Sequence, residues 1–213
     1  SVMAKSWNKK IFKQIDEQVN KASKDLAEER GACPDAAEYG YQERFSNKTA
    51  IAPTASISII CGGSSPGIEP IAANSYTHKT LSGSFNVRNK YLKKILEKYK
   101  KNNDEVWSSI TTNQGSVAHL DFLTAEEKDT FKTAFEIDQR WIVELGADRT
   151  PHISQAQSVN IFIPADIHKK ELHDIHFQAW KKGLKSLYYC RSKSIQRAEN
   201  VNAGSSTDVK KNV

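Results

Sequence analysis

The stretch VNIFIPADIHKKELHDIHFQAWKKGLKSLYYC, residues 159–190, decides the fold class of this chain. It begins with a short apolar run at 159–163, which is typical of a buried strand. Pro164 and Asp166 indicate the start of a helix, and Gly183 indicates its end. The apolar stripe of that helix consists of Ile167, Leu172, Ile175, Phe177, Ala179 and Trp180. Residues 184–190 read as a second strand, and because a crossover of this length joins parallel strands, the sequence predicts a parallel strand-helix-strand unit.

The first part of the chain predicts a helix followed by a strand. Apolar residues recur every three or four positions from Ser6 to about Arg30, which indicates an amphipathic helix closed by Gly31. Residues 49–52 are short and apolar and predict a strand, which runs into a turn at 53–58.

Two further helices are predicted in the middle of the chain. One covers residues 87–99, and the other starts with a capping box of Thr124 and Glu127 and ends at Gly146. Alternation of helices with apolar strands is typical of an α/β fold with a parallel sheet, which is the fold class that the sequence predicts.

The composition excludes several classes of protein. With 213 residues, 38% of them hydrophobic, the chain is neither disordered nor fibrous. No apolar run approaches the roughly 18–20 residues of a membrane span, so we expect no membrane insertion, and the first ten residues show no secretory signal. The three cysteines, Cys33, Cys61 and Cys190, lie far apart and form no disulfide framework, which favours a reducing, cytoplasmic location.

The formal net charge of +6 comes mainly from the part of the chain after His168, whereas residues 121–148 are net acidic. Basic runs of this kind are typical of a solvated helix face. They leave open an electrostatic surface for a phosphate-bearing small ligand or a partner protein. A non-catalytic basic module that binds phosphate or nucleic acid is a further alternative. The affinity of such a module for nucleic acid would fall steeply with rising salt.

Residues 52–58, Ala-Pro-Thr-Ala-Ser-Ile-Ser, form the first candidate site. Between a strand and a helix they would present backbone N–H groups and the hydroxyls of Thr54 and Ser56 at a helix N-terminus, which favours a phosphate. The same pattern is typical of an ordinary N-cap, so both interpretations stay open. Gly62 and Gly63 follow, without the Gly-Lys-Ser/Thr of a Walker loop.

Histidine and cysteine offer weaker candidates. His168, His173 and His176 lie on one predicted helix, but no Glu follows His173 as in zinc proteases, so a metal site is the less favoured interpretation. Cys33 and Cys61 have no neighbouring His in the sequence and are expected to be small buried residues rather than nucleophiles.

Tyr188 and Tyr189 close the last predicted strand between Lys185 and Arg191. Adjacent residues of a strand face opposite sides, so the spacing predicts one Tyr in the core and the other at the surface. No chemistry of these phenols follows from the pattern alone.

Seven stretches carry a resemblance to a known family. They are TAIAPTASIS at 49–58, GIEP at 67–70, FKTAFEIDQRW at 131–141, DRTP at 148–151, QAQSVN at 155–160, HFQAWKKG at 176–183 and SLYYCR at 186–191. In this order they resemble the C-terminal part of the large (alpha) subunit of class I ribonucleotide reductase. The resemblance runs from about Ser1 to Glu199.

The resemblance implies a function and a set of site residues. Members of the family reduce ribonucleoside diphosphates to deoxyribonucleotides by radical chemistry on a ten-stranded α/β barrel, of which this chain would form the C-terminal part. Tyr188 and Tyr189 would be the paired tyrosines of the radical path, with Tyr189 towards the small subunit and Tyr188 towards the active-site cysteine. The residues that would bind the substrate diphosphate are Thr54, Ala55, Ser56 and Ile57.

The resemblance also implies partners. These are a small (beta) subunit with a dimetal radical cofactor, thioredoxin or glutaredoxin as electron donor, and the N-terminal half of the large subunit. No cofactor or metal is expected in this chain itself. Residues 1–199 would form the barrel portion, and residues 200–213 are expected to be a mobile tail.

The sequence departs from the family in its cysteines. It has no Asn-Leu-Cys-x-Glu segment, no tail cysteine pair and no N-terminal nucleotide-sensing cone, so the isolated chain is expected to be inactive. Either the subunit is divided between two polypeptides, as in some viral members, or the chain is truncated; a degenerate structural remnant is a third possibility. Half a barrel leaves an open sheet edge, so we expect the chain to need a complementary half.

Overall fold

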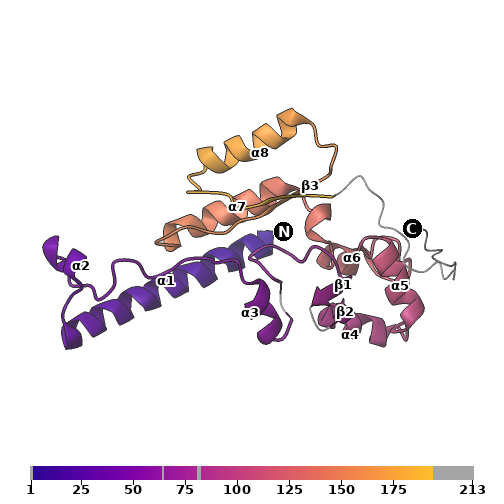
Figure 1. Cartoon of the computed structure of the whole chain (residues 1–213), viewed down its shortest axis with the longest axis horizontal. Helices are drawn as coiled ribbons and strands as arrows, with labels where there is room; N and C mark the ends of the chain where they lie inside the picture. Colours follow the sequence, from indigo (N-terminus) through magenta and orange to yellow (C-terminus); the bar gives the residue numbers. More distant parts are fainter. Residues whose placement is uncertain (1, 64, 81–82, 194–213) are drawn as a thin grey trace, which may run out of the picture.

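The computed structural model describes residues 2–63, 65–80 and 83–193, so the predicted tail at 200–213 lies outside the described residues. Figure 1 shows two groups of elements side by side. One group contains the helices α1 (Val2–Arg30), α7 (Gln139–Arg149) and α8 (Lys169–Lys181) with the strand β3 (Ile161–Ile163). The other contains the strands β1 (Ser75–Thr80) and β2 (Gly83–Arg88) with the helices α4 (Lys90–Lys98), α5 (Asp104–Thr112) and α6 (Ala125–Thr130).

The predicted N-terminal helix is confirmed as α1 (Val2–Arg30). It ends at Arg30 and is followed by Gly31, whose φ of +83° is a left-handed conformation that glycine adopts without strain. The helix lies along α7 (Gln139–Arg149), as Figure 1 shows, and Nδ2 of Asn8 donates to the carbonyl of Leu145 at 3.0 Å.

The predicted parallel strand-helix-strand unit is also confirmed. Strand β3 (Ile161–Ile163) pairs in parallel with β4 (Cys190–Ser192), and α8 (Lys169–Lys181) forms the crossover between them. A parallel bridge between Ile51 and Gln157 places a third segment beside the chain that leads into β3. The chain is therefore α/β, with the parallel connections that the sequence predicts.

The core of this unit lies between the parallel segments and the helices α7 and α8. Its buried residues are Ile142, Val143, Val159, Ile161, Ile163, Ile175 and Ala179. Two of the predicted stripe residues of α8, Ile175 and Ala179, belong to it, whereas Phe177 and Trp180 are exposed.

The extended segments are shorter than predicted. Residues 49–52 contain only the bridge at Ile51, and β4 begins at the last residue of the predicted strand 184–190. The helix α8 begins five residues after Pro164, because the His168 side chain accepts a hydrogen bond from the amide of Lys170 and forms the N-cap.

The second group contains a hairpin that the sequence pattern did not predict. Strand β1 (Ser75–Thr80) pairs antiparallel with β2 (Gly83–Arg88). The predicted helix at 87–99 is therefore wrong at its start, and α4 (Lys90–Lys98) begins after Asn89, whose side chain accepts hydrogen bonds from the first turn. The helix α5 (Asp104–Thr112) packs beside it. Their shared core consists of Leu92, Leu96, Trp107, Ile110, Val117, Leu120 and Leu123.

The capping box of Thr124 and Glu127 is confirmed, but the single helix predicted from it to Gly146 is wrong. The chain forms α6 (Ala125–Thr130), a 3-10 turn η1 (Ala134–Glu136) and then α7. Two further caps interrupt the helix, because the Thr133 amide donates to Glu136 and the Asp138 carboxylate accepts from the amide of Arg140. The helix α7 continues through Gly146 to Arg149, where η2 (Thr150–His152) with its proline follows.

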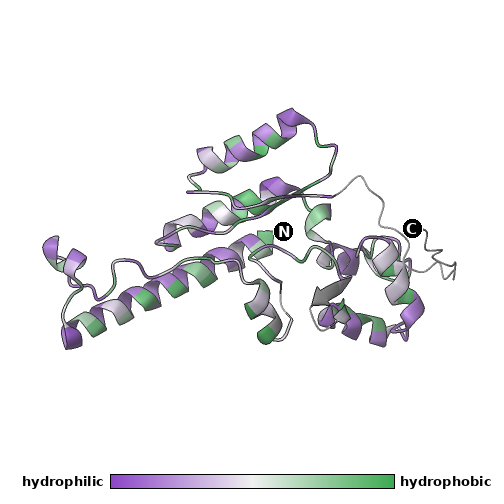
Figure 2. Ribbon diagram, viewed as in Figure 1, coloured by the Kyte–Doolittle hydropathy of each residue, from purple (hydrophilic) through white to green (hydrophobic). Residues whose placement is uncertain are grey.

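Several apolar side chains remain exposed. Figure 2 shows hydrophobic residues recurring along α1, where Trp7 is 59% exposed and Ile11 is 48% exposed. Ile15 is also exposed, whereas Phe12 lies under the guanidinium of Arg149. None of the described helices combines the length and the apolar character that crossing a membrane requires.

Candidate functional site

Tyr188 and Tyr189 form an aromatic pair directly before β4. Their ring centroids lie 4.2 Å apart, with an angle of 53° between the ring planes. The prediction of one buried and one exposed ring is wrong, because both are about half exposed (47% and 54%). The two residues precede the regular strand, so the alternation of a strand does not separate their side chains.

The backbone of the pair is held by the neighbouring strand. The amide of Tyr188 donates to the carbonyl of Val159 at 2.8 Å, and the carbonyl of Tyr189 accepts from the amide of Ile161 at 2.9 Å. These parallel-ladder bonds set the register of the pair against the buried β3 strand.

The electrostatics of the pair are unequal. A hydrogen bond to the Tyr189 phenol raises the pKa of Tyr188, and the positive charge of Arg191 acts weakly in the opposite direction. The guanidinium of Arg191 lies 5.5 Å from the centroid of the Tyr189 ring, within the range of a cation–π contact. Tyr188 therefore remains protonated at neutral pH, with its phenol in contact with that of Tyr189.

Behind the pair lies a buried polar contact that sequence reasoning missed. The Glu69 side chain, only 5% exposed, accepts hydrogen bonds from the amide of Asn160 and from its Nδ2 at 3.2 Å. Oδ1 of Asn160 in turn accepts from the amide of Tyr189 at 3.3 Å. The one signal in the sequence is a polar residue, Asn160, inside the apolar run 159–163.

A second buried polar group links α1, α7 and the segment before β3. The Arg149 side chain, 4% exposed, donates to Gln157 Oε1 at 3.0 Å and to Asn8 Oδ1 at 3.1 Å. Burial lowers the pKa of the Arg149 guanidinium to about 10, and the charges of Glu69 and Asp148 oppose that shift. The sequence did not predict this buried arginine, because an arginine in a helix usually indicates a solvated position.

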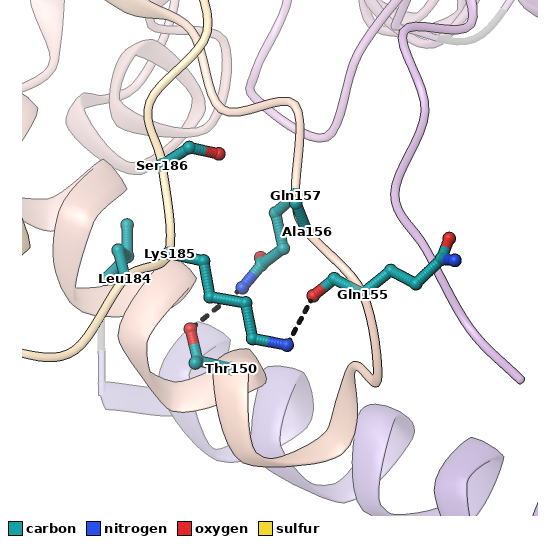
Figure 3. A pocket seen from close by; sticks show the side chains of 7 residues that line it. All are labelled: Thr150, Gln155, Ala156, Gln157, Leu184, Lys185 and Ser186. Atoms are coloured by element: carbon teal, nitrogen blue, oxygen red, sulfur yellow. Dashed lines mark hydrogen bonds between the residues drawn. The ribbon is translucent and has the colours of Figure 1, made fainter. Parts of the chain in front are cut away.

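Lys185 anchors the segment that leads into the tyrosine pair. Its ammonium group donates to the carbonyls of Ser154 at 2.7 Å and Gln155 at 2.9 Å. Figure 3 shows Lys185 reaching across a small hollow towards Gln155, while Gln157 contacts Thr150 on the same side. The side chain fills the hollow, so this place holds the loop rather than offering a binding site.

Of the four predicted phosphate-binding residues, Thr54 precedes the short helix α3 (Ala55–Ile60), and Ala55, Ser56 and Ile57 begin it. The amide of Thr54 donates to the carbonyl of Pro66 at 3.2 Å, so one of the expected N–H groups is already used. Ala55, Ser56 and Ile57 occupy the exposed first turn, where helix N–H groups have no carbonyl partner within the helix. The geometry is compatible with both interpretations, an N-terminal turn and an anion site.

A cavity of about 640 Å³ lies between the end of α3 and the β1–β2 hairpin. Its lining includes Ser58, Ser65, Tyr76, Tyr91 and Phe131. None of residues 54–57 lines this cavity, so the predicted phosphate site and the cavity are separate features of the surface.

The histidine and cysteine candidates do not come together. His168 caps α8, and Nδ1 of His176 lies 2.8 Å from the carbonyl of Leu172. Among the residues that the structure describes, no group of three or more His, Cys, Asp or Glu side chains could hold a metal ion. The expectation of burial is wrong for Cys61, which is exposed beside the positive-φ turn of Gly62, and Cys33 is partly exposed.

The chain is similar to known proteins both in sequence and in fold. The family model described as "Ribonucleotide reductase, barrel domain" matches residues 35–190. The chain is 45% identical, over 94% of its length, to the "Ribonucleoside-diphosphate reductase large subunit" of Invertebrate iridescent virus 6. It is 46% identical over 94% of its length to the protein of the same name from Invertebrate iridescent virus 3.

The structural comparison agrees. The fold superposes on the "Actinobacillus ureae class Id ribonucleotide reductase alpha subunit" with a TM-score of 0.83 and 38% identity. That match covers 91% of this chain and 35% of the other. The chain spans 21% and 32% of the length of the two viral relatives.

Proposed function

The chain belongs to the ribonucleotide reductase large-subunit family and forms part of its α/β barrel; we propose that it acts in the reduction of ribonucleoside diphosphates to deoxyribonucleotides. Its own contribution is twofold. The tyrosine pair carries the radical towards the active site, and residues 54–57 hold the substrate diphosphate. The thiols that act on the ribose belong to the complementary part of the barrel, because Cys33, Cys61 and Cys190 match none of the family's redox positions.

The observation that carries the proposal is the contact between Tyr188 and Tyr189. A phenol that loses an electron also loses its proton, so a radical on Tyr189 takes one electron and one proton from the hydroxyl of Tyr188. Tyr189 is then a phenol again, and Tyr188 carries the radical. Two residues of the same kind have similar energies for this step, so the transfer runs in both directions at little cost.

The raised pKa of Tyr188 supports a coupled transfer. The proton stays on the phenol until the electron leaves, and the hydrogen bond to Tyr189 provides the acceptor for it. The proposed direction is from the small subunit to Tyr189 and then through Tyr188 to the active-site cysteine. The small subunit supplies the radical from its dimetal cofactor.

The phosphate role of Thr54, Ala55, Ser56 and Ile57 is supported by their place on an exposed first turn. The amides of residues 55–57 and the hydroxyls of Thr54 and Ser56 would donate to the diphosphate oxygens. The partial positive charge of a helix N-terminus favours such an anion.

The partners follow from the same interpretation. The exposed stripe of α1, with Trp7 and Ile11, suits a contact with the complementary part of the barrel, since burying apolar surface is the main drive for association. We infer that the small subunit docks near the tyrosine pair and that thioredoxin or glutaredoxin supplies the electrons.

The test is reconstitution. The chain is co-expressed with a polypeptide that carries the cone and the cysteine-bearing first half of the barrel, and the complex is assayed for small-subunit-dependent reduction of a nucleoside diphosphate. Activity in the wild type, its loss in Tyr188→Phe, and its retention in Tyr41→Phe would support the proposal. Tyr41 is a matched control, because it is exposed and distant in sequence from the pair.

Two outcomes contradict the proposal. A complex that forms without turnover would mean that the chain is a decayed or truncated subunit. If no complex forms and the chain binds nucleic acid with a steep salt dependence, the non-catalytic basic module is favoured instead.

A further inference from the structure

We propose that Glu69 is a positioning residue that sets the place of Tyr189 through Asn160. The inference rests on the proposed function, and it adds a residue outside the tyrosine pair that controls the rate of radical transfer. The path consists of two contacts, from the Glu69 carboxylate to Asn160 and from Asn160 Oδ1 to the amide of Tyr189.

The burial of Glu69 requires an explanation. A carboxylate removed from water loses hydration, and it persists in a protein when hydrogen bonds and an opposite charge replace that loss. Both oxygens of Glu69 accept hydrogen bonds from the one residue Asn160, and the charge of Glu69 interacts favourably with the buried Arg149. An apolar residue would fill this position at lower cost, so the carboxylate points to a specific task.

The task follows from the chemistry of the two side chains. An ionised carboxylate only accepts hydrogen bonds, whereas an Asn amide has one donor end and one acceptor end. Glu69 therefore draws Nδ2 of Asn160 towards itself, and Oδ1 is left facing the amide of Tyr189. The charge on Glu69 thus decides which end of Asn160 meets the tyrosine backbone.

The segment around Glu69 is itself held tightly. Its carbonyl accepts from Oγ of Ser65 at 2.6 Å, and a Cβ at position 67 would overlap with Oε2 of Glu69, so a side chain there would displace the Glu69 carboxylate. The carbonyl of Pro66 in the same segment accepts from the amide of Thr54. Glu69 therefore connects the turn that supports the proposed phosphate loop to the tyrosine pair.

The direction of the hydrogen bonds makes the proposal testable by exchanging the two side chains. In E69Q the new amide would donate towards Nδ2 of Asn160, which is also a donor, so Asn160 either loses this contact or turns its donor end to Tyr189. In N160D two carboxylates would face each other. In the double variant E69Q/N160D, the amide introduced at position 69 donates to one oxygen of the carboxylate introduced at position 160. The other oxygen of that carboxylate accepts from the amide of Tyr189, and the buried charge count is unchanged.

The experiment uses the complex of this chain with the complementary part of the barrel and the small subunit. We expect E69Q and N160D each to lower kcat by about tenfold or more, because each removes one oriented contact that the transfer step needs. KM for the diphosphate should change less than about twofold. The double variant is expected to recover most of kcat. Hydrogen–deuterium exchange over residues 186–192 should rise in each single variant and return to the wild-type level in the double variant.

Several results would overturn the proposal. If E69Q keeps the wild-type kcat and exchange, Glu69 does not position the pair; if KM rises while kcat holds, Glu69 acts on the phosphate loop alone. If a single variant does not assemble, the double variant decides: restored kcat and protection support the proposal, and their absence contradicts it. If the wild type itself shows no turnover, the proposed function fails, and the exchange data still test the contact between Glu69, Asn160 and Tyr189.

Discussion

The rings of Tyr188 and Tyr189 contact each other across a centroid distance of 4.2 Å, although the two residues are neighbours in the chain. Regular strand geometry would send them to opposite faces. The two side chains are not separated in this way because the pair lies before β4. Hydrogen bonds with Asn160, Val159 and Ile161 hold the backbone of the pair. The contact is the basis of the radical path proposed above, and it leads to the first prediction.

In Tyr189→Phe we expect the pKa of Tyr188 to fall towards its ordinary value. The hydrogen bond to the Tyr189 phenol is the main cause of the raised pKa, and phenylalanine removes the acceptor while it keeps the ring contact. A pH titration of 13C-labelled tyrosine by NMR measures the change. Tyr41→Phe serves as the control, and a Tyr188 pKa unchanged by Tyr189→Phe would contradict the assignment of its cause.

Replacement of Arg149 by Met should destabilise the protein by about 3 kcal/mol, because it leaves Gln157, Asn8 and the buried Glu69 without their cationic partner. Arg140 is the matched control on the same helix. It is exposed and pairs with Asp138, so Arg140→Met should cost less than about 1 kcal/mol. Urea unfolding of the assembled protein measures the free energy of unfolding of both variants. Equal losses would contradict the prediction that the buried Arg149 contributes more to stability than the exposed Arg140.

The capping box of α6 predicts a dependence of stability on pH. Hydrogen bonds from Thr124 lower the pKa of Glu127 in the folded state, so the stabilisation is present above the unfolded pKa and is lost as pH falls through the folded pKa. Thermal unfolding from about pH 7 to about pH 3 should therefore show a smaller acid-induced loss in Glu127→Gln than in the wild type. Glu126→Gln, which lies outside the box, should keep the wild-type slope.

Two glycines with nearly the same φ allow the steric and the conformational cost of a Gly→Ala substitution to be compared. A Cβ at Gly115 (φ +81°) would overlap with Ala73, whereas at Gly183 (φ +79°) it would meet no atom within 4 Å. We expect Gly183→Ala to cost about 1 kcal/mol from the backbone conformation, and Gly115→Ala to cost more. Chemical unfolding of the two variants compares them, and equal losses would mean that the contact with Ala73 relaxes freely.

The parallel unit was predictable because its signals are local. The apolar run 159–163, the stop at Gly183 and the length of the crossover together permit only a parallel connection. The helix α1 and the capping box of Thr124 were predictable for the same reason. In each case a few residues close in sequence carry the whole pattern.

The failures have physical causes as well. The apolar periodicity after Thr124 is continuous, but caps at Thr133 and Asp138 satisfy backbone groups and interrupt the helix. The β1–β2 hairpin was missed because β2 is mostly exposed and both strands carry little apolar alternation. Burial of Cys61 was expected from its residue type, and the turn at Gly62 places it at the surface instead.

The α/β class, the parallel crossover, the family and the candidate residues 54–57, Tyr188 and Tyr189 could all be read from the sequence, because they depend on local periodicity and on short motifs kept in order. Three features required the folded chain: the contact between the rings of Tyr188 and Tyr189, the hydrogen bonds from Asn160 to Glu69, and the burial of Arg149 beside Gln157. Glu69 and Asn160 are 91 residues apart in the chain, and no local pattern records a contact over such a distance. Packing of β3 against α7, and of α7 against α1 and α8, brings such groups together, and their mutual hydrogen bonds then replace the water lost on burial.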